Sequence, residues 1–131
     1  MTELFTPKWM QKLMDEWNKE DELAQELSNI GFNSTIAYGF DGEDTPRGVL
    51  VIKKGKAISA TAFDEQELNW DLRASKESWQ KWFNKPPGMM ALGMAYTSRK
   101  LKFKKGDYTA MIKDPRMAGP FLKSFTVMGR V

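Results

Sequence analysis

Residues that could perform chemistry are scarce in this chain, because its 131 residues include neither cysteine nor histidine. Without cysteine there can be no disulfide, thiolate metal site, iron–sulfur cluster or thiol nucleophile. Without histidine there can be no Ser-His or Cys-His catalytic arrangement and no imidazole metal ligand. Any catalysis would depend on Asp, Glu, Lys, Tyr, Ser or Thr.

The remaining candidates for catalysis lack a partner. Two adjacent carboxylate pairs, at 15–16 and 64–65, fall on the polar side of an expected helix and in an expected loop, where contact with solvent explains acidic residues. Glycines at the two ends of 88–93 have the spacing of a phosphate loop, but Met-Ala follows where that motif needs Lys and a hydroxyl residue. We therefore expect a protein that is not an enzyme, with no catalytic residue, no cofactor and no metal ion.

Charge is distributed unevenly along the chain, with net charges of −4, 0 and +7 for residues 1–32, 33–98 and 99–131. Segment 99–105 alternates basic and apolar residues, as some platforms for single-stranded nucleic acid do. Alternation places Phe103 on the face opposite the lysines, so we favour a strand with Phe103 in the core and no nucleic-acid partner. The same lysines are compatible with transient contact to an anionic membrane surface.

Large apolar side chains are concentrated between Trp79 and Met128, and many are methionines. Methionine side chains are flexible and can adapt to apolar partners of varied shape. Taken alone, this excess is typical of an ordinary core. Segment 56–63, however, carries small residues that leave room above a sheet, and the helices expected to cover it are short and interrupted. That combination favours an apolar gap.

The spacing of apolar residues predicts one long helix or two short ones over 7–30, ended by Gly31. A period of two predicts strands at 35–40, 48–53, 56–63, 70–74 and 99–105. Three hairpin-like connections in a row imply an antiparallel meander. Short helices are expected after Ser75, over 89–97 and within 106–113, and a helical tail over 114–131.

The chain is long enough for one domain, 1–131, and shows no export signal in residues 1–14. Its most apolar window, 89–95, is far shorter than the roughly 20 residues that a membrane span requires. Its last residues, 128–131, do not form a peroxisomal signal of the Ser-Lys-Leu type. We expect a soluble cytoplasmic protein.

Two strings and the order of the elements resemble the sterol carrier protein family, in its type-two sterol-binding domain. The first string is WDLRASKESW at 70–79, which is similar to the family's strand and capped helix. The second is AYTSRKLKF at 95–103, which is similar to its helix end and Lys-Leu-Lys strand. The resemblance covers a core at 32–113. It departs from the family at Gly93 and Arg99, where members often have Gln and Gly.

The resemblance implies an α+β fold with a five-stranded, mainly antiparallel sheet, and helices on one face that enclose an apolar tunnel. It also implies non-catalytic binding or carriage of a fatty acid, fatty acyl-CoA, sterol or similar apolar molecule. If this architecture holds, the residues that surround the tunnel are Trp79, Phe83, Met90, Met94, Phe103, Met111, Phe121 and Leu122. Each sits on the apolar face of its own element, which is equally consistent with an ordinary core.

A second function fits the same sequence. The fold could have a closed core and act as an accessory module that docks a partner protein through its basic C-terminal surface. An apolar cavity larger than a water molecule would distinguish the carrier from the accessory module.

Overall fold

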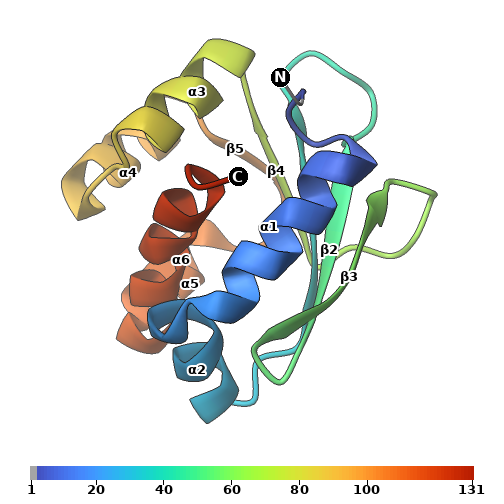
Figure 1. Ribbon diagram of the computed structural model, residues 1–131. Helices are drawn as coiled ribbons and strands as arrows, with labels where there is room; N and C mark the ends of the chain where they lie inside the picture. The colour runs from blue at the N-terminus through green and yellow to red at the C-terminus, as the bar shows by residue number, and fades with distance from the viewer. Residues whose placement is uncertain (1–2) are drawn as a thin grey trace.

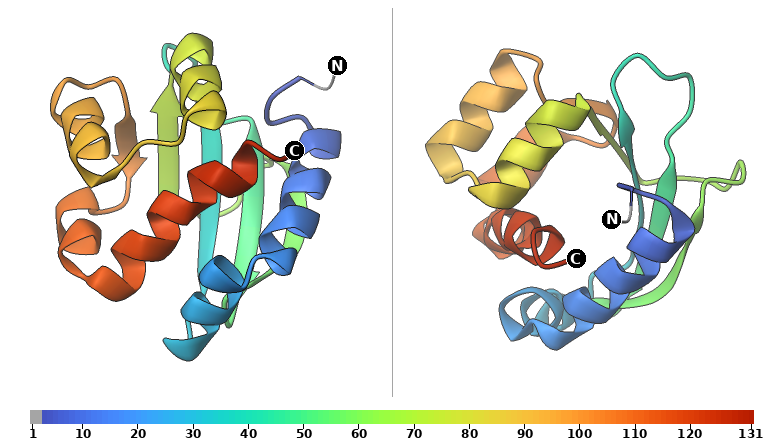
Figure 2. Two further views of the ribbon diagram at one scale, coloured as in Figure 1. Left: turned by 60° about the vertical axis from the view of Figure 1, so that its left-hand side comes forward. Right: turned by 45° about the horizontal axis from the view of Figure 1, so that its top comes forward.

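The computed structural model describes residues 3–131, so Met1 and Thr2 of the predicted domain 1–131 lie outside the described residues. The fold is α+β, as predicted, with helices covering one face of a curved sheet (Figures 1 and 2). Within residues 3–131 no helix is long and apolar enough to cross a bilayer. The elements in chain order are α1 (Pro7–Lys19), α2 (Asp21–Asn29), β1 (Ser34–Phe40), β2 (Gly48–Lys53), β3 (Lys56–Ala62), β4 (Trp70–Ala74), α3 (Lys76–Asn84), α4 (Met89–Thr97), β5 (Lys102–Lys105), α5 (Tyr108–Lys113) and α6 (Pro115–Met128).

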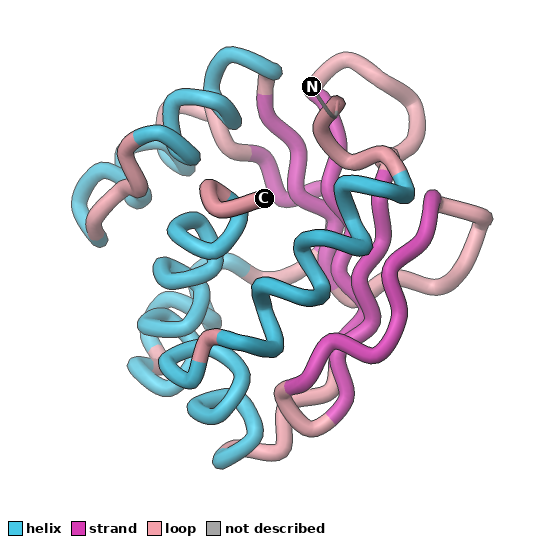
Figure 3. The backbone as a smooth tube through the Cα atoms, viewed as in Figure 1, coloured by secondary structure: helices cyan, strands magenta, loops and turns pink. Residues whose placement is uncertain are grey.

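The five strands are ordered β3-β2-β1-β4-β5, with β1 and β4 parallel and the other pairs antiparallel. The meander expected from the sequence is therefore wrong at one connection, because β4 lies beside β1 rather than beside β3 (Figure 3). The loop between β3 and β4 carries Phe63 and Leu68, which pack on Ala37 and Val49. Burial of these side chains stabilises the crossover on the sheet face away from the helices.

Alternation along the strands gives the sheet two different faces. In β1, Ile36 and Tyr38 belong to the main core with the helices, whereas Ala37 belongs to the small cluster on the opposite face. In β4, Leu72 likewise joins the main core. The parallel register pairs Tyr38 with Leu72, so these two side chains are neighbours on the helix-covered face.

Helix α1 lies across the hairpin of β2 and β3 and is held there by polar side chains. The Asn18 amide donates to the Ala57 carbonyl at 2.9 Å and accepts from the Ala57 amide at 2.8 Å. The Trp17 indole donates to the carbonyl of Gly55 at 3.0 Å. The room above the small residues of β3 is thus occupied by α1 and does not form the expected gap. Gly55 has a φ of +83° in the tight turn, a conformation that glycine adopts without strain.

The N-terminal region forms two helices rather than one, and α2 packs against α6. At the junction Glu20 caps α2 and pairs with Arg130 at 2.9 Å, while Glu22 pairs with Lys123 at 2.8 Å. The hydrogen bond from Arg130 lowers the pKa of Glu20, and the bond to Glu22 raises the pKa of Lys123. Acidic residues from the N-terminal part of the chain therefore pair with basic residues from its C-terminal part.

The last strand is shorter than predicted. Arg99 has a φ of +63°, and the amides of Lys100 and Leu101 both bond the Ala95 carbonyl, so these residues end α4. Strand β5 begins only at Lys102. Arg99 occupies the position at which the resembled family often has glycine, and its left-handed backbone explains why glycine would suit that position.

Candidate functional site: an apolar cavity between the sheet and α6

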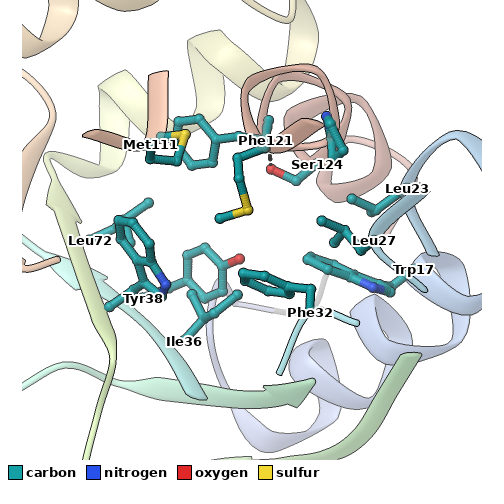
Figure 4. A pocket seen from close by; sticks show the side chains of 13 residues that line it. Trp17, Leu23, Leu27, Phe32, Ile36, Tyr38, Leu72, Met111, Phe121 and Ser124 are labelled. Carbon is teal, nitrogen blue, oxygen red and sulfur yellow. Dashed lines mark hydrogen bonds between the residues drawn. The ribbon is translucent and has the colours of Figure 1, made fainter. Parts of the chain in front are cut away.

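An apolar cavity lies between the sheet and α6, with the two N-terminal helices closing one side (Figure 4). It contains about 460 Å³ of space free of protein atoms, part of it open to solvent, of which about 50 Å³ is wide enough for water. A water molecule needs roughly 10–15 Å³ of such space, so this is more than a water-sized void. The lining residues are Trp17, Leu23, Leu27, Phe32, Ile36, Tyr38, Trp70, Leu72, Met111, Met117, Pro120, Phe121 and Ser124.

The walls come from segments that are distant in the sequence. The floor is the helix-covered face of β1 and β4, where the parallel pairing places Tyr38 beside Leu72. The hydrogen bond between Trp17 and the turn of the β2–β3 hairpin fixes the indole that forms the side wall. Phe121 and Ser124, one turn apart on α6, form the roof.

Two hydroxyl groups interrupt the apolar lining. Ser124 donates to the Phe121 carbonyl within α6, which satisfies its proton. Tyr38 is 3% exposed, and its hydroxyl points into the cavity (Figure 4). Desolvation raises the pKa of Tyr38 far above its ordinary value, so the phenol is neutral at physiological pH.

The cavity holds no charged side chain among the described residues that line it. The lining therefore places no carboxylate or amine beside its two hydroxyl groups, Tyr38 and Ser124, to act as the base that would activate them. Elsewhere in residues 3–131, no group of three or more His, Cys, Asp or Glu is placed to hold a metal ion. What the arrangement can do is remove an apolar molecule from water.

The structure brings two of the eight predicted site residues to this cavity: Met111 of α5 and Phe121 of α6. Phe103 of β5 lies just behind the lining, with ring centroids 5.9 Å from Trp70 and 6.0 Å from Phe121. Leu122 is half-buried in α6 and lies outside the lining.

Trp79 and Phe83 of α3 lie elsewhere in the core. Trp79 is fully buried, donates from its indole to the Gly39 carbonyl at 2.9 Å, and packs against Phe83. Phe83 in turn stacks on Trp9 of α1 and borders a surface hollow near the two termini. These two aromatic rings connect α3 to α1, away from the cavity.

Met90 and Met94 lie on the molecular surface, with exposed fractions of 81% and 65%. Helix α4 buries Leu92 and Ala95 instead. Met94 borders a hollow between α3 and α4, whose rim also carries Lys81 and Lys85. The structure therefore does not bring these two methionines to the cavity.

Most of the lining was missed by reasoning from the sequence, although one signal was available. The alternation in 35–40 and 70–74 correctly grouped Ile36 with Tyr38, and Trp70 with Leu72. Had 70–74 been placed beside 35–40 instead of beside 56–63, these four residues would have formed one floor. The walls from α1 and α2 carried no comparable signal, because a helical apolar stripe is the same for any buried surface.

The fold of this chain is similar to that of several solved structures, whereas comparisons of its sequence find no match. No family model matches the sequence, and no curated protein matches it. Among solved structures, a crystal structure of sterol carrier protein 2 matches with a TM-score of 0.77 and 21% identity, covering 98% of this chain and 99% of that one.

Two further solved structures are similar over most of their length. A conserved hypothetical protein from Thermus thermophilus, described as possibly a sterol carrier protein, matches with a TM-score of 0.72 and 19% identity over 99% of this chain and 90% of that one. The ubiquinone synthesis protein UbiJ-SCP2 matches with a TM-score of 0.61 and 12% identity over 98% and 93%. The chain has the sterol carrier protein fold, as its sequence resemblance implied.

Proposed function

We propose that this protein binds or carries a lipid-like apolar molecule without chemically changing it, and that the molecule occupies the cavity beneath α6. The observation that carries this proposal is an apolar cavity without a charged residue in its described lining, at the junction of sheet and helices. The likeness to sterol carrier protein 2 supports the same function for this fold. The accessory module with a closed core is not favoured, because the volume of the cavity exceeds the volume that a single water molecule needs.

Burial of hydrocarbon would provide the affinity. A chain of ten methylenes contributes about 8 kcal/mol on transfer from water, at ~0.8 kcal/mol per methylene, before the costs of association. The water-accessible part of the cavity, about 50 Å³, is too small for such a chain. Binding therefore requires the lining to open, and the flexible thioethers of Met111 and Met117 provide side chains that can move at low cost.

The entrance that we propose lies where lining residues are half-exposed. Phe32, just before β1, and Trp70, the first residue of β4, lie at one edge of the floor. Met117 and Phe121 of α6 are the half-exposed residues of the roof. An apolar molecule entering between these pairs passes only apolar and aromatic side chains.

Titration with a long-chain alcohol, a fatty acid and a sterol, followed by tryptophan fluorescence, tests the proposal, because Trp17 and Trp70 line the cavity. We expect saturable binding of at least one ligand in the micromolar range. Ser124→Leu places a larger apolar group in the cavity and should weaken binding at least tenfold. Thr126→Leu, on the same helix but outside the lining, is the matched control and should bind normally. Absence of saturable binding of all three ligands to the unaltered protein would contradict the proposal.

We also propose that α4 contacts an anionic membrane during loading or delivery. Of the four large apolar side chains exposed in residues 3–131, three belong to α4: Met89, Met90 and Met94. Exposed apolar clusters mark interaction surfaces. Lysines 81, 85 and 100 line the adjoining hollow, and such a combination of methionine and lysine suits an apolar interior behind anionic headgroups.

Sedimentation with phosphatidylcholine vesicles, with and without phosphatidylserine, tests the membrane contact. Binding should require phosphatidylserine and should be lost in Met90→Asp. Ile58→Asp is the control, since Ile58 is also exposed but lies on β3. If both variants bind as the unaltered protein does, α4 is not the contact surface.

A further inference from the structure

The Tyr38 hydroxyl differs from the other buried polar groups near the cavity. Buried hydroxyls and indoles in proteins are normally hydrogen bonded. The indoles of Trp17 and Trp79 donate to backbone carbonyls, and Ser124 donates to the carbonyl of Phe121. No residue among 3–131 hydrogen bonds the Tyr38 hydroxyl, and although Tyr38 is only 3% exposed, its hydroxyl oxygen is not fully enclosed by protein atoms.

The unpaired hydroxyl is aimed at the place where a ligand would lie. Figure 4 shows its oxygen directed into the cavity, with Phe32 and Trp17 on one side and α6 above. Tyr38 is one of the residues that line the cavity. No buried side-chain polar atom of the described residues lacks a partner, so the Tyr38 hydroxyl is not sealed off by protein atoms and is reachable from the cavity, where a ligand oxygen can accept its hydrogen bond.

The lining also determines whether the ligand oxygen beside Tyr38 can carry a charge. Ser124 supplies a second hydroxyl oxygen that can accept a hydrogen bond, and no described lining residue supplies a positive charge. A carboxylate or phosphate placed beside Tyr38 would be buried without a counter-ion, which is strongly unfavourable. A hydroxyl or a carbonyl carries no charge and can accept from the phenol.

We infer that the cavity selects apolar molecules that carry an uncharged oxygen, a hydroxyl or a carbonyl, which hydrogen bonds the Tyr38 hydroxyl. This inference rests on the proposed function and narrows its ligand class. Fatty alcohols, sterols and long-chain ketones satisfy it, whereas a fatty acid or acyl-CoA would have to leave its charged group outside.

The position of Tyr38 in β1 predicts the orientation of the ligand. Ile36 pairs with Trp70 at the proposed entrance, and Tyr38 pairs with Leu72 two residues further along. At about 3.3 Å per residue, the Tyr38 backbone lies roughly 7 Å further along the strands than Trp70. The oxygen is therefore the inner end of the ligand, and the hydrocarbon extends toward the entrance.

The experiment compares four probes of equal chain length: decanol, the corresponding methyl ketone, decyl chloride and decanoate at neutral pH. Binding to the unaltered protein, Tyr38→Phe and Tyr96→Phe is measured by tryptophan fluorescence. Tyr96 is the matched control, because it is half-buried and stacks on Tyr108 outside the cavity lining. Circular dichroism checks that each variant is folded.

We expect the unaltered protein to bind decanol or the ketone more tightly than decyl chloride, and decanoate most weakly. Tyr38→Phe should weaken binding of the oxygen-containing neutral probe about fivefold, as expected for one neutral hydrogen bond, and leave decyl chloride unchanged. Loss for decanol alone would identify a hydroxyl as the partner, and loss for the ketone as well would identify any neutral oxygen.

Two other outcomes have separate meanings. If no probe binds saturably, the proposed function is wrong. If the probes bind but Tyr38→Phe and Tyr96→Phe are indistinguishable, or decanoate binds as tightly as decanol, the cavity does not select a neutral oxygen and this inference is overturned while the proposed function stands.

Discussion

Phe121 and Phe125 lie one turn apart on α6, with ring centroids separated by 5.4 Å. Phe125 is fully buried and lies 6.3 Å from the Trp79 ring and 5.9 Å from Trp82. Phe121 is half-buried and borders the cavity. Replacing each by alanine therefore compares a closed core with a cavity wall on the same helix.

The expected costs differ because only one ring is surrounded by protein atoms. Phe125→Ala leaves a void in a filled core and should lower the free energy of unfolding by about 3–5 kcal/mol. Full burial of a phenylalanine side chain contributes about 1.5–3 kcal/mol, and half-buried Phe121 already faces empty space, so Phe121→Ala should cost only about 1–2 kcal/mol.

Urea unfolding followed by far-ultraviolet circular dichroism measures both values without depending on tryptophan fluorescence. If Phe125→Ala does not fold, the corresponding leucine variants give the same ranking at smaller cost. Equal costs, within about 0.5 kcal/mol, for the two positions would show instead that Phe121 is an ordinary core residue and not a cavity wall.

Three further predictions concern stability. Asp71→Ala should cost about 3–5 kcal/mol in urea unfolding, because Arg73 is 2% exposed and loses bonds of 2.6 and 2.9 Å, whereas the double change Asp71→Leu with Arg73→Met should recover most of that loss. Burial raises the pKa of Tyr38 in the folded protein, so above pH ~10 this phenol ionises in the unfolded chain but stays neutral in the folded one. The free energy of unfolding of the unaltered protein should therefore fall more steeply with pH than that of Tyr38→Phe, by up to about 1.4 kcal/mol per pH unit. Parallel curves for the two proteins would contradict this. Gly55→Ala should cost more than about 2 kcal/mol by thermal unfolding, since its φ is +83° and a Cβ would clash with the Ala24 carbonyl oxygen; a neutral result would mean that this turn can shift.

Local spacing predicted the elements well, because each depends on residues close together in the chain. Ser75 was expected to cap a helix, and its hydroxyl accepts from the Ser78 amide at 3.1 Å. The strands at 48–53 and 70–74 have the predicted bounds. A period of two or 3.6 shows which side of an element is apolar, and these elements have one clear apolar side.

The candidate site was harder to predict because it depends on which apolar sides meet. Met90 and Met94 were placed in the cavity from an apolar helix, but α4 is apolar around its whole circumference, so spacing could not show which side is buried. Trp17 and Leu27 belong to helices assigned outside the family-like core, yet they form a wall of the cavity. Which side of α4 is buried, and which helices line the cavity, both depend on contacts between segments that are distant in the sequence.

The central claim is that an apolar ligand occupies the cavity beneath α6. Methyl NMR during a titration with decanol tests it most directly, because Leu23, Leu27, Ile36 and Leu72 line the cavity, whereas Leu92 is buried in α4. We expect saturable shifts for the methyl groups of the four lining residues and little change for Leu92. No saturable shift at the lining residues, or shifts confined to Leu92, would contradict it.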